Sequence, residues 1–165
     1  MDVSSSSSPD VRLRPVRGTD LQAFFEHQRD PEAARMAAFP PRDEQAFAKH
    51  WSRILNEPGI VVRTVLADGE VAGNVVSFER SGRREVGYWL GRAFWGRGIA
   101  TRALAAFLAG FDTRPLHALT AKHNTASQRV LEKCGFVRCG EELWTPPTGG
   151  DPVEDFVFVL GAEGG

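Results

Sequence analysis

Cysteine, methionine and tyrosine are scarce in this chain, which excludes several kinds of site. Its 165 residues include two cysteines, two methionines and one tyrosine. Two cysteines cannot build a disulfide framework, and together with the histidines they fit no zinc-binding spacing. We therefore interpret Cys134 and Cys139 as buried free thiols, and we expect no metal site.

The sequence also lacks a long apolar run and an excess of charge of either sign. It carries 20 basic and 21 acidic residues, for a net charge of -1. No stretch is long enough to span a membrane, and no global field favours nucleic acid or an anionic membrane surface. The opening MDVSSSSSPD has neither the basic nor the apolar part of a secretory signal. We expect a cytoplasmic protein whose partners include neither nucleic acid nor a membrane.

The hydrophobic pattern predicts one mixed α/β domain. Residues 1–10 are interpreted as a disordered polar tail, and residues 11–165 as a single domain. The segment from Asp30 to Glu44 is expected to be a loop between two helices. The expected elements are a strand at 11–16, helices from 20 and from 43, two strands around a turn at 67–70, a strand at 83–91, a helix at 98–109, a strand at 115–122, a helix at 124–134, and strands at 136–144 and 154–160. This order predicts one sheet with helices on both faces.

The segment FWGRGIATRAL, residues 94–104, joins an apolar strand to an amphipathic helix through two glycines. Such a turn is a recurring phosphate cradle, because backbone N–H groups at a helix start point outward and carry partial positive charge. Gly96 and Gly98 allow a close approach of the main chain, and Arg97 adds charge. The Walker pattern is absent, and Thr101 stands where the dinucleotide fingerprint has glycine or alanine. On these residues alone, an anion site and a purely structural turn remain equally open.

Three segments together resemble the GCN5-related N-acetyltransferases (GNAT), and most of all the branch with the ribosomal-protein N-terminal acetyltransferases. They are VRLRPVRGTDLQAFF (11–25), EVGYWLGRAFWGRGIATRAL (85–104) and NTASQRVLEKCGF (124–136). The resemblance implies the GNAT fold, a mixed and mostly antiparallel sheet of six or seven strands with helices on both faces. It also implies acetyl-CoA as co-substrate. The family's cofactor loop, Q/R-x-x-G-x-G/A, falls on residues 95–100, where Trp95 departs from the pattern.

The resemblance further implies a V-shaped gap beside the strand at 83–91. The pantetheine arm of coenzyme A would pair there like an added strand, and a backbone N–H near Leu90 would polarise the thioester carbonyl. Asn124 would contact the pantetheine arm, or would serve only as the N-cap of its helix. The residues implied in cofactor binding are Leu90, Arg92, Arg97, Gly98, Ile99, Ala100, Thr101, Asn124 and Ser127.

Acetyl transfer to an amine needs a proton acceptor and a proton donor for the leaving thiolate. Glu85, at the start of the cofactor strand, is the expected acceptor, although a surface ion pair with a neighbouring arginine is the alternative. The tyrosine that protonates the thiolate in many family members is replaced here by Leu131. Ser127 lies one helical turn earlier and is the implied donor. Tyr88, the only tyrosine, is expected to lie on the wrong segment for this role. The catalytic set is therefore Glu85, Ser127 and Leu90.

We predict an N-acetyltransferase that moves the acetyl group of acetyl-CoA to a primary amine by direct attack in a ternary complex. The acceptor, a protein N-terminus or a small molecule, stays open. The acceptor side is expected to involve Arg35, Met36, Phe39, Arg42, Asp43, Glu44 and Trp144. One alternative is a non-catalytic acyl-CoA-binding regulatory domain, and another is a nucleotide-binding protein. Exposed sheet edges make a homodimer plausible.

Overall fold

The computed structural model describes residues 8–146 and 150–161. Residues 1–7 of the expected tail and 147–149 of the last loop lie outside the described residues. Pro9 and Asp10, which the sequence prediction placed in the tail, contact the domain. The Pro9 carbonyl accepts a hydrogen bond from Arg102, and the Asp10 N–H donates to Asp68 Oδ1 at 2.8 Å.

The described part of the chain forms seven strands and five α-helices, with two short 3-10 turns at Gly18–Asp20 and Arg92–Phe94. The strands are β1 (Val11–Arg14), β2 (Val61–Ala67), β3 (Glu70–Arg80), β4 (Arg83–Leu90), β5 (Leu116–Ala121), β6 (Val137–Trp144) and β7 (Val153–Leu160). The helices are α1 (Leu21–Arg29), α2 (Pro31–Ala37), α3 (Glu44–Asn56), α4 (Ile99–Ala109) and α5 (Thr125–Lys133).

One sheet carries all seven strands in the order β1-β2-β3-β4-β5-β7-β6. Among the described strands, β4 and β5 pair in parallel, and every other neighbouring pair is antiparallel. The predicted mixed, mostly antiparallel sheet is confirmed.

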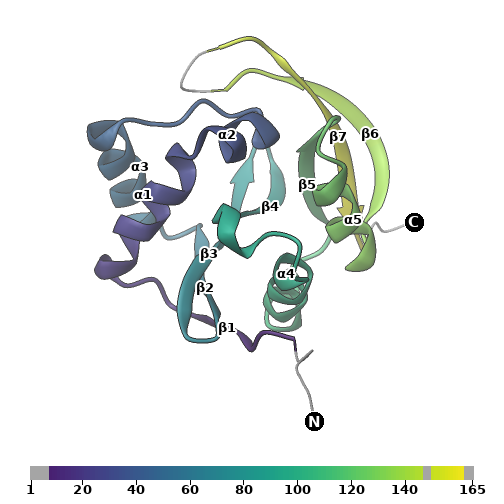
Figure 1. Ribbon diagram of the computed structural model, residues 1–165. Helices are drawn as coiled ribbons and strands as arrows, with labels where there is room; N and C mark the ends of the chain where they lie inside the picture. Colours follow the sequence, from purple (N-terminus) through teal and green to yellow (C-terminus); the bar gives the residue numbers. More distant parts are fainter. Residues whose placement is uncertain (1–7, 147–149, 162–165) are drawn as a thin grey trace.

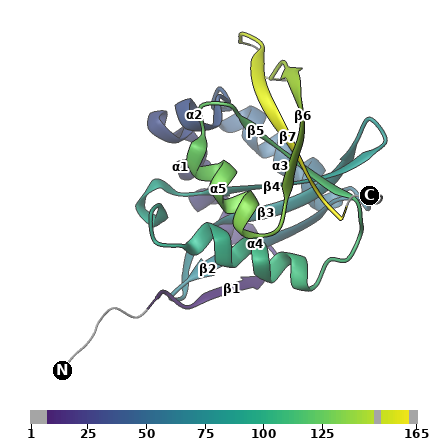
Figure 2. The same ribbon diagram turned by 90° about the vertical axis from the view of Figure 1, so that its right-hand side faces the viewer.

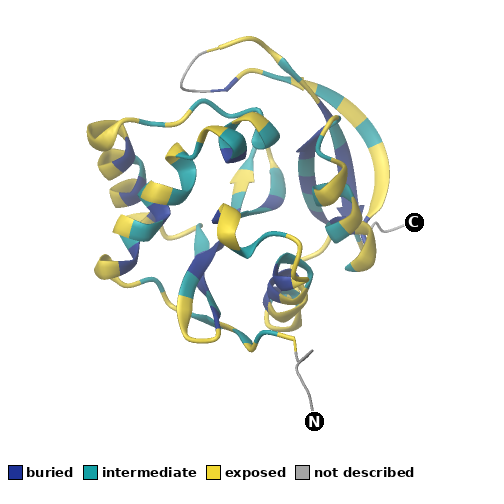
Figure 3. Ribbon diagram, viewed as in Figure 1, coloured by how far each residue is buried: buried dark blue, intermediate teal, exposed yellow. Residues whose placement is uncertain are grey.

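Helices cover both faces of this sheet, as Figures 1 and 2 show: α4 and α5 lie on one face, and α1, α2 and α3 on the other. A core forms on each side. Leu104, Leu116 and Phe158 belong to the larger core beneath α4 and α5. Phe24 and Trp51 belong to the smaller core beneath α1 and α3. Figure 3 shows the buried residues concentrated where helices meet the central strands. The predicted placement of helices on both faces is therefore confirmed.

The segment expected as a loop after Asp30 contains α2, so that prediction was wrong. Asp30 ends α1 and also caps α2, because its carboxylate accepts a hydrogen bond from the Ala33 N–H at 3.3 Å. Pro31 occupies the first helical position, where its missing N–H costs nothing. The Asp-Pro pair is thus both a stop and a start signal, and only the stop was recognised.

Candidate active site

The parallel strands β4 and β5 form the predicted gap. Their one paired register is Glu85 with His117, and beyond it the strands diverge (Figure 1). A cavity of about 740 Å³ lies along the gap and extends toward α1 and α3. Residues 86–89 of β4 and 118–121 of β5 line it. The sheet therefore opens at its centre, where the resemblance implied that a pantetheine arm would lie.

Backbone groups of β4 face this gap. The Gly91 N–H donates to the Ala72 carbonyl of β3 at 2.9 Å. Because main-chain groups alternate in direction along a strand, the amides of Tyr88 and Leu90 point away from β3 and toward β5. The Leu90 carbonyl agrees with this assignment, since it accepts a hydrogen bond from the Trp95 indole at 3.2 Å. The Leu90 amide thus lies on the edge of β4 that faces the gap, where it could contact a thioester.

The glycine turn before α4 has left-handed backbone at both glycines, with φ of 73° at Gly96 and 75° at Gly98. A Cβ at either position would meet no atom within 4 Å, so conformation rather than protein packing requires glycine. Gly98 caps α4 without a side-chain hydrogen bond. Within the described residues, the amides of Ile99, Ala100 and Thr101 have no hydrogen-bond acceptor. The start of α4 therefore presents a row of free donors, the geometry expected of a phosphate cradle.

The basic residues near this turn differ in their surroundings. Arg92 forms an ion pair with Asp30 at 3.2 Å, which partly neutralises its charge. Arg97 is exposed, and its guanidinium lies 5.9 Å from the centre of the Phe94 ring. The Ile99 side chain is in the core, so only its backbone faces the turn. Arg97 is thus the more available of the two predicted cations.

Asn124 caps α5, because its Oδ1 accepts a hydrogen bond from the Ser127 N–H at 3.1 Å. This is the structural role that the sequence left open for Asn124. Both residues also line the cavity. A contact with the pantetheine arm stays a prediction.

Tyr88 lies on β4, the segment expected from the sequence, but its side chain reaches α5. Its hydroxyl donates a hydrogen bond to Ser127 Oγ at 3.1 Å. Burial raises the pKa of Tyr88, so its hydroxyl keeps its proton at neutral pH. Leu131, at the usual tyrosine position, is buried in the core. The sequence could not show this pair, because β4 and α5 meet only in the tertiary structure.

Glu85 is buried, with 4% of its surface exposed, and it also lines the cavity. Arg80 donates to its two oxygens at 3.2 and 2.9 Å. Arg83 donates to Oε2 at 3.1 and 2.8 Å and also pairs with Glu142 at 2.7 Å. The ion pair that the sequence offered as the alternative therefore exists, although inside the protein. Arg84 instead donates to the Gly59 carbonyl at 2.8 Å.

Asp155 is a cavity residue that the sequence analysis missed. It lies on β7 opposite Ala121 of β5, and only 6% of its surface is exposed. Within the described residues, no hydrogen bond or ion pair engages its carboxyl group. Burial raises the pKa of Asp155 to about 6, and the nearby Glu142 carboxylate adds to this effect. The alternation in VEDFVFVL was the available signal, because it places Asp155 on the same side as the inward-facing Val157 and Val159.

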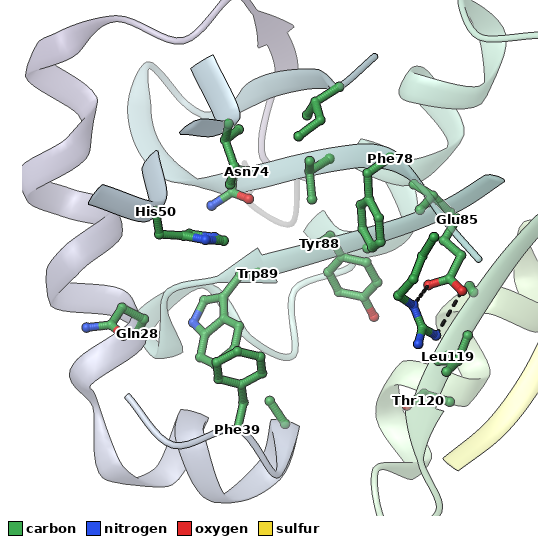
Figure 4. Close-up of a pocket in the computed structure, with 18 of the residues that line it drawn as sticks. Gln28, Phe39, His50, Asn74, Phe78, Glu85, Tyr88, Trp89, Leu119 and Thr120 are labelled. Atoms are coloured by element: carbon green, nitrogen blue, oxygen red, sulfur yellow. Dashed lines mark hydrogen bonds and ion pairs between the residues drawn. The ribbon is translucent and has the colours of Figure 1, made fainter. Parts of the chain in front are cut away.

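Aromatic side chains line one end of the cavity (Figure 4). Phe39 and Trp144 pack with ring centres 5.5 Å apart, and the Arg42 guanidinium lies 4.9 Å from the Phe39 ring centre. Burial, with Arg42 and Arg53, lowers the pKa of His50 to about 4, so this ring is neutral. Figure 4 shows Phe39, His50 and Trp89 toward one end of the pocket and Glu85 toward the other.

Of the residues expected on the acceptor side, Phe39, Arg42 and Trp144 line the cavity. The others have different positions or partners. Arg35 pairs with Glu32, and Asp43 caps α3 by accepting from the Ala46 N–H at 2.8 Å. Met36 and Glu44 are not among the cavity residues.

Both cysteines are free thiols, but the prediction that both are buried was wrong. Cys134 is half-buried, and Cys139 is exposed on β6. Within residues 8–146 and 150–161, no three histidine, cysteine, aspartate or glutamate side chains gather as a metal site would need. In the same residues, no helix has the length and apolar character to cross a membrane.

Comparison with known proteins agrees with this geometry. Residues 10–137 match the family model described as an acetyltransferase (GNAT) domain. A Bacillus licheniformis protein named uncharacterized N-acetyltransferase p20 is 28% identical over 144 residues, covering 79% of this chain and 80% of the relative.

Solved structures share the fold. A GNAT-family acetyltransferase from Bacillus anthracis has a TM-score of 0.76 at 18% identity, covering 93% of this chain and 96% of that one. Mycobacterium smegmatis RimJ, solved with a CoA disulfide, has a TM-score of 0.74 at 22% identity. The match covers 91% of this chain and 81% of RimJ. Since the family model spans most of the chain, the protein belongs to the GNAT family and is an acetyl-CoA-dependent N-acetyltransferase.

Proposed function

We propose that this enzyme transfers the acetyl group of acetyl-CoA to a primary amine by direct attack in a ternary complex. The main support is one continuous space. The gap between β4 and β5 runs into a cavity whose walls are aromatic at one end and carry carboxylates at the other. An acetyl group in the gap and an amine in the cavity would meet without a covalent enzyme intermediate.

In this proposal the pyrophosphate of acetyl-CoA binds the free amides between Arg97 and Thr101. Arg92 and the Arg97 side chain add positive charge. The Leu90 amide, on the gap edge of β4, hydrogen-bonds the thioester carbonyl and stabilises the oxyanion. Asn124 and Ser127 contact the far side of the pantetheine arm.

The two catalytic proton transfers are assigned to opposite faces of the sheet. Ser127, joined to Tyr88, provides the hydroxyl proton for the leaving thiolate. A carboxylate on the face of α1 and α3 accepts the proton of the amine. Glu85 stays a prediction for this second role, although four hydrogen bonds from two guanidinium groups already engage its oxygens.

The acceptor is a protein N-terminus or a small-molecule amine. The Phe39 and Trp144 wall suits an acceptor with an apolar portion next to its amine. Cytoplasmic location and a homodimer stay predictions.

The test of this function begins with acetyl-CoA titrated into the protein by calorimetry, with NAD and ATP as controls. Gly98→Trp should abolish acetyl-CoA binding by filling the cradle. Gly69→Trp is the matched control, because Gly69 has a similar φ of 84° and equally open space, but lies in the β2–β3 turn. Preferential binding of NAD, or equal loss in both variants, would contradict the cofactor assignment.

A transfer assay then separates enzyme from binding domain. Release of the coenzyme A thiol is measured with tyramine, spermidine and a short serine-initiated peptide. Turnover above acetyl-CoA hydrolysis with one of these amines supports the proposal. Binding of acetyl-CoA without turnover of any amine would favour the regulatory alternative.

A further inference from the structure

We propose that Asp155, rather than Glu85, takes the proton from the acceptor amine. This inference rests on the proposed acetyl transfer and names the residue that would act as its base.

Strand register places both carboxylates on one face of the sheet. Glu85 pairs with His117 of β5, and Asp155 pairs with Ala121 of the same strand. His117 and Ala121 are four residues apart, so their side chains, and those of their partners, share a face. Tyr88, three residues after Glu85, points to the opposite face. Asp155 and the Tyr88–Ser127 pair therefore lie on opposite faces of the sheet. The amine and the leaving thiolate can thus exchange their protons with different groups.

The partners of the two carboxylates differ. Arg80 and Arg83 donate four hydrogen bonds to Glu85, and these occupy the lone pairs of its carboxylate. Asp155 accepts no hydrogen bond from the described residues, although it is nearly as buried as Glu85. A buried carboxyl group without a partner is costly to the fold and is characteristic of a functional site.

Charged groups from four other segments act on Asp155. Glu142 of β6 and Glu85 of β4 favour its protonated form, whereas Arg80 of β3 and His123 after β5 oppose it. With burial as the largest effect, the pKa of Asp155 is about 6. At neutral pH the group is mostly a carboxylate, yet it has enough proton affinity to act as a general base.

The proposed step balances. The Asp155 carboxylate takes one proton from the R–NH3+ group of the acceptor. The neutral amine then attacks the thioester carbon, so that an N–C bond forms and the C–S bond breaks. The second nitrogen proton passes to solvent water as the amide forms, while the hydroxyl pair gives one proton to the thiolate and regains one from solvent. Asp155 finally returns its proton to solvent, which yields the amide, free coenzyme A and one H+.

The test compares Asp155→Asn with Glu154→Gln, a change of the preceding residue, which is exposed and pairs with Lys122. The pH dependence of kcat/KM is measured with the amine of the panel that the wild type acetylates. Asp155→Asn should lower kcat by about 100-fold and remove the acidic limb, with little change in acetyl-CoA affinity. Glu154→Gln should behave like the wild type.

A second measurement does not depend on turnover or on any variant. Carboxyl carbon NMR of the labelled wild-type protein follows the titration of Asp155 directly. A titration midpoint near pH 6 supports the proposal. An ordinary aspartate midpoint overturns it, even if the enzyme accepts no amine of the panel. If the wild type acetylates an amine and Asp155→Asn keeps its kcat and acidic limb, the Asp155 assignment fails while the proposed function stands.

Discussion

The hydroxyl of Tyr88 donates a hydrogen bond to the hydroxyl of Ser127 and so joins β4 to α5 across the gap. The helix position that carries a tyrosine in many GNAT enzymes holds Leu131, which is buried in the core. The only tyrosine of the chain thus reaches α5 from the facing strand. A phenol group is therefore available on this side of the gap although the family position lacks one.

Tyr88→Phe should lower kcat by about 10-fold, because it removes the partner that orients the Ser127 hydroxyl. The KM for acetyl-CoA should change little, since the phenyl ring still fills its place. Steady-state kinetics with saturating amine measure both values. An unchanged kcat would show that the Tyr88 hydroxyl takes no part in thiolate protonation.

The double variant Tyr88→Phe with Ser127→Ala should be no slower than Ser127→Ala alone. Two hydroxyls that act as one donor lose their function together, so their effects are not additive. The double-mutant cycle on kcat checks this. Fully additive losses would indicate that the two hydroxyls act separately.

Glu85→Gln should reduce stability, because Arg80 and Arg83 would lose the buried negative charge between them. The expected loss is about 2 to 4 kcal/mol in the free energy of unfolding, measured by urea denaturation. Glu70→Gln, an exposed change at the start of β3, is the control. A large loss of kcat with unchanged stability would instead return the role of base to Glu85.

Asp20 gives the fold a stability that acid removes. Its carboxylate, 2% exposed, accepts hydrogen bonds from Arg14 at 2.7 and 2.9 Å and from Thr64 at 2.7 Å. The Arg14 hydrogen bonds, with help from the Arg17 N–H and Thr64, lower the pKa of Asp20 to about 2. Because the folded pKa lies below the unfolded one, this stability is present above about pH 4 and is lost as the pH falls toward about 2.

Asp20→Asn should therefore cost about 2 to 4 kcal/mol at neutral pH and less in acid. Thermal unfolding at several pH values measures the difference, with the exposed Asp112→Asn as control. A loss that is independent of pH would contradict the assigned ion pair.

Asp155→Asn should stabilise the protein at neutral pH. The folded pKa of Asp155 is raised, so the wild type loses stability as the pH rises from about 4 to about 6. The asparagine variant does not carry this charge, and its advantage should reach about 2 kcal/mol above that range. Unfolding curves of both proteins, recorded in acid and at neutral pH, test this. The prediction would be contradicted if the variant and the wild type were equally stable at both pH values.

Local signals predicted much of the fold. The Asp68-Gly69 turn has positive φ at both residues, so the sequence located the β2–β3 hairpin correctly. Gly98 likewise marks the start of α4. The close neighbour of Gly91 is the His27 ring, which a Cβ would meet at 2.5 Å. Glycine identity indicated a close approach there without showing which group approaches.

The site was predicted less completely, because its proton-transfer groups come from segments far apart in the sequence. Alternation along β4 shows which face Tyr88 occupies, but not that α5 covers that face. The ion pair of Glu85 with the nearby Arg83 was offered as an alternative, but nothing local shows that Arg80 would join it or that Asp155 would have no partner. Such differences arise from sheet order, which a single sequence does not display.

The divergence of β4 from β5 makes the sheet two smaller ladders, one of β1 to β4 and one of β5, β7 and β6, that share a single rung at Glu85 and His117. In the proposed binding mode, a pantetheine arm in the gap would supply hydrogen bonds that a neighbouring strand otherwise makes. The cofactor is then a component of the architecture as well as a reactant. In the proposed binding mode, release of coenzyme A would leave the two ladders joined within the sheet by this one rung, so that cofactor binding would also strengthen the connection between the two parts of the sheet.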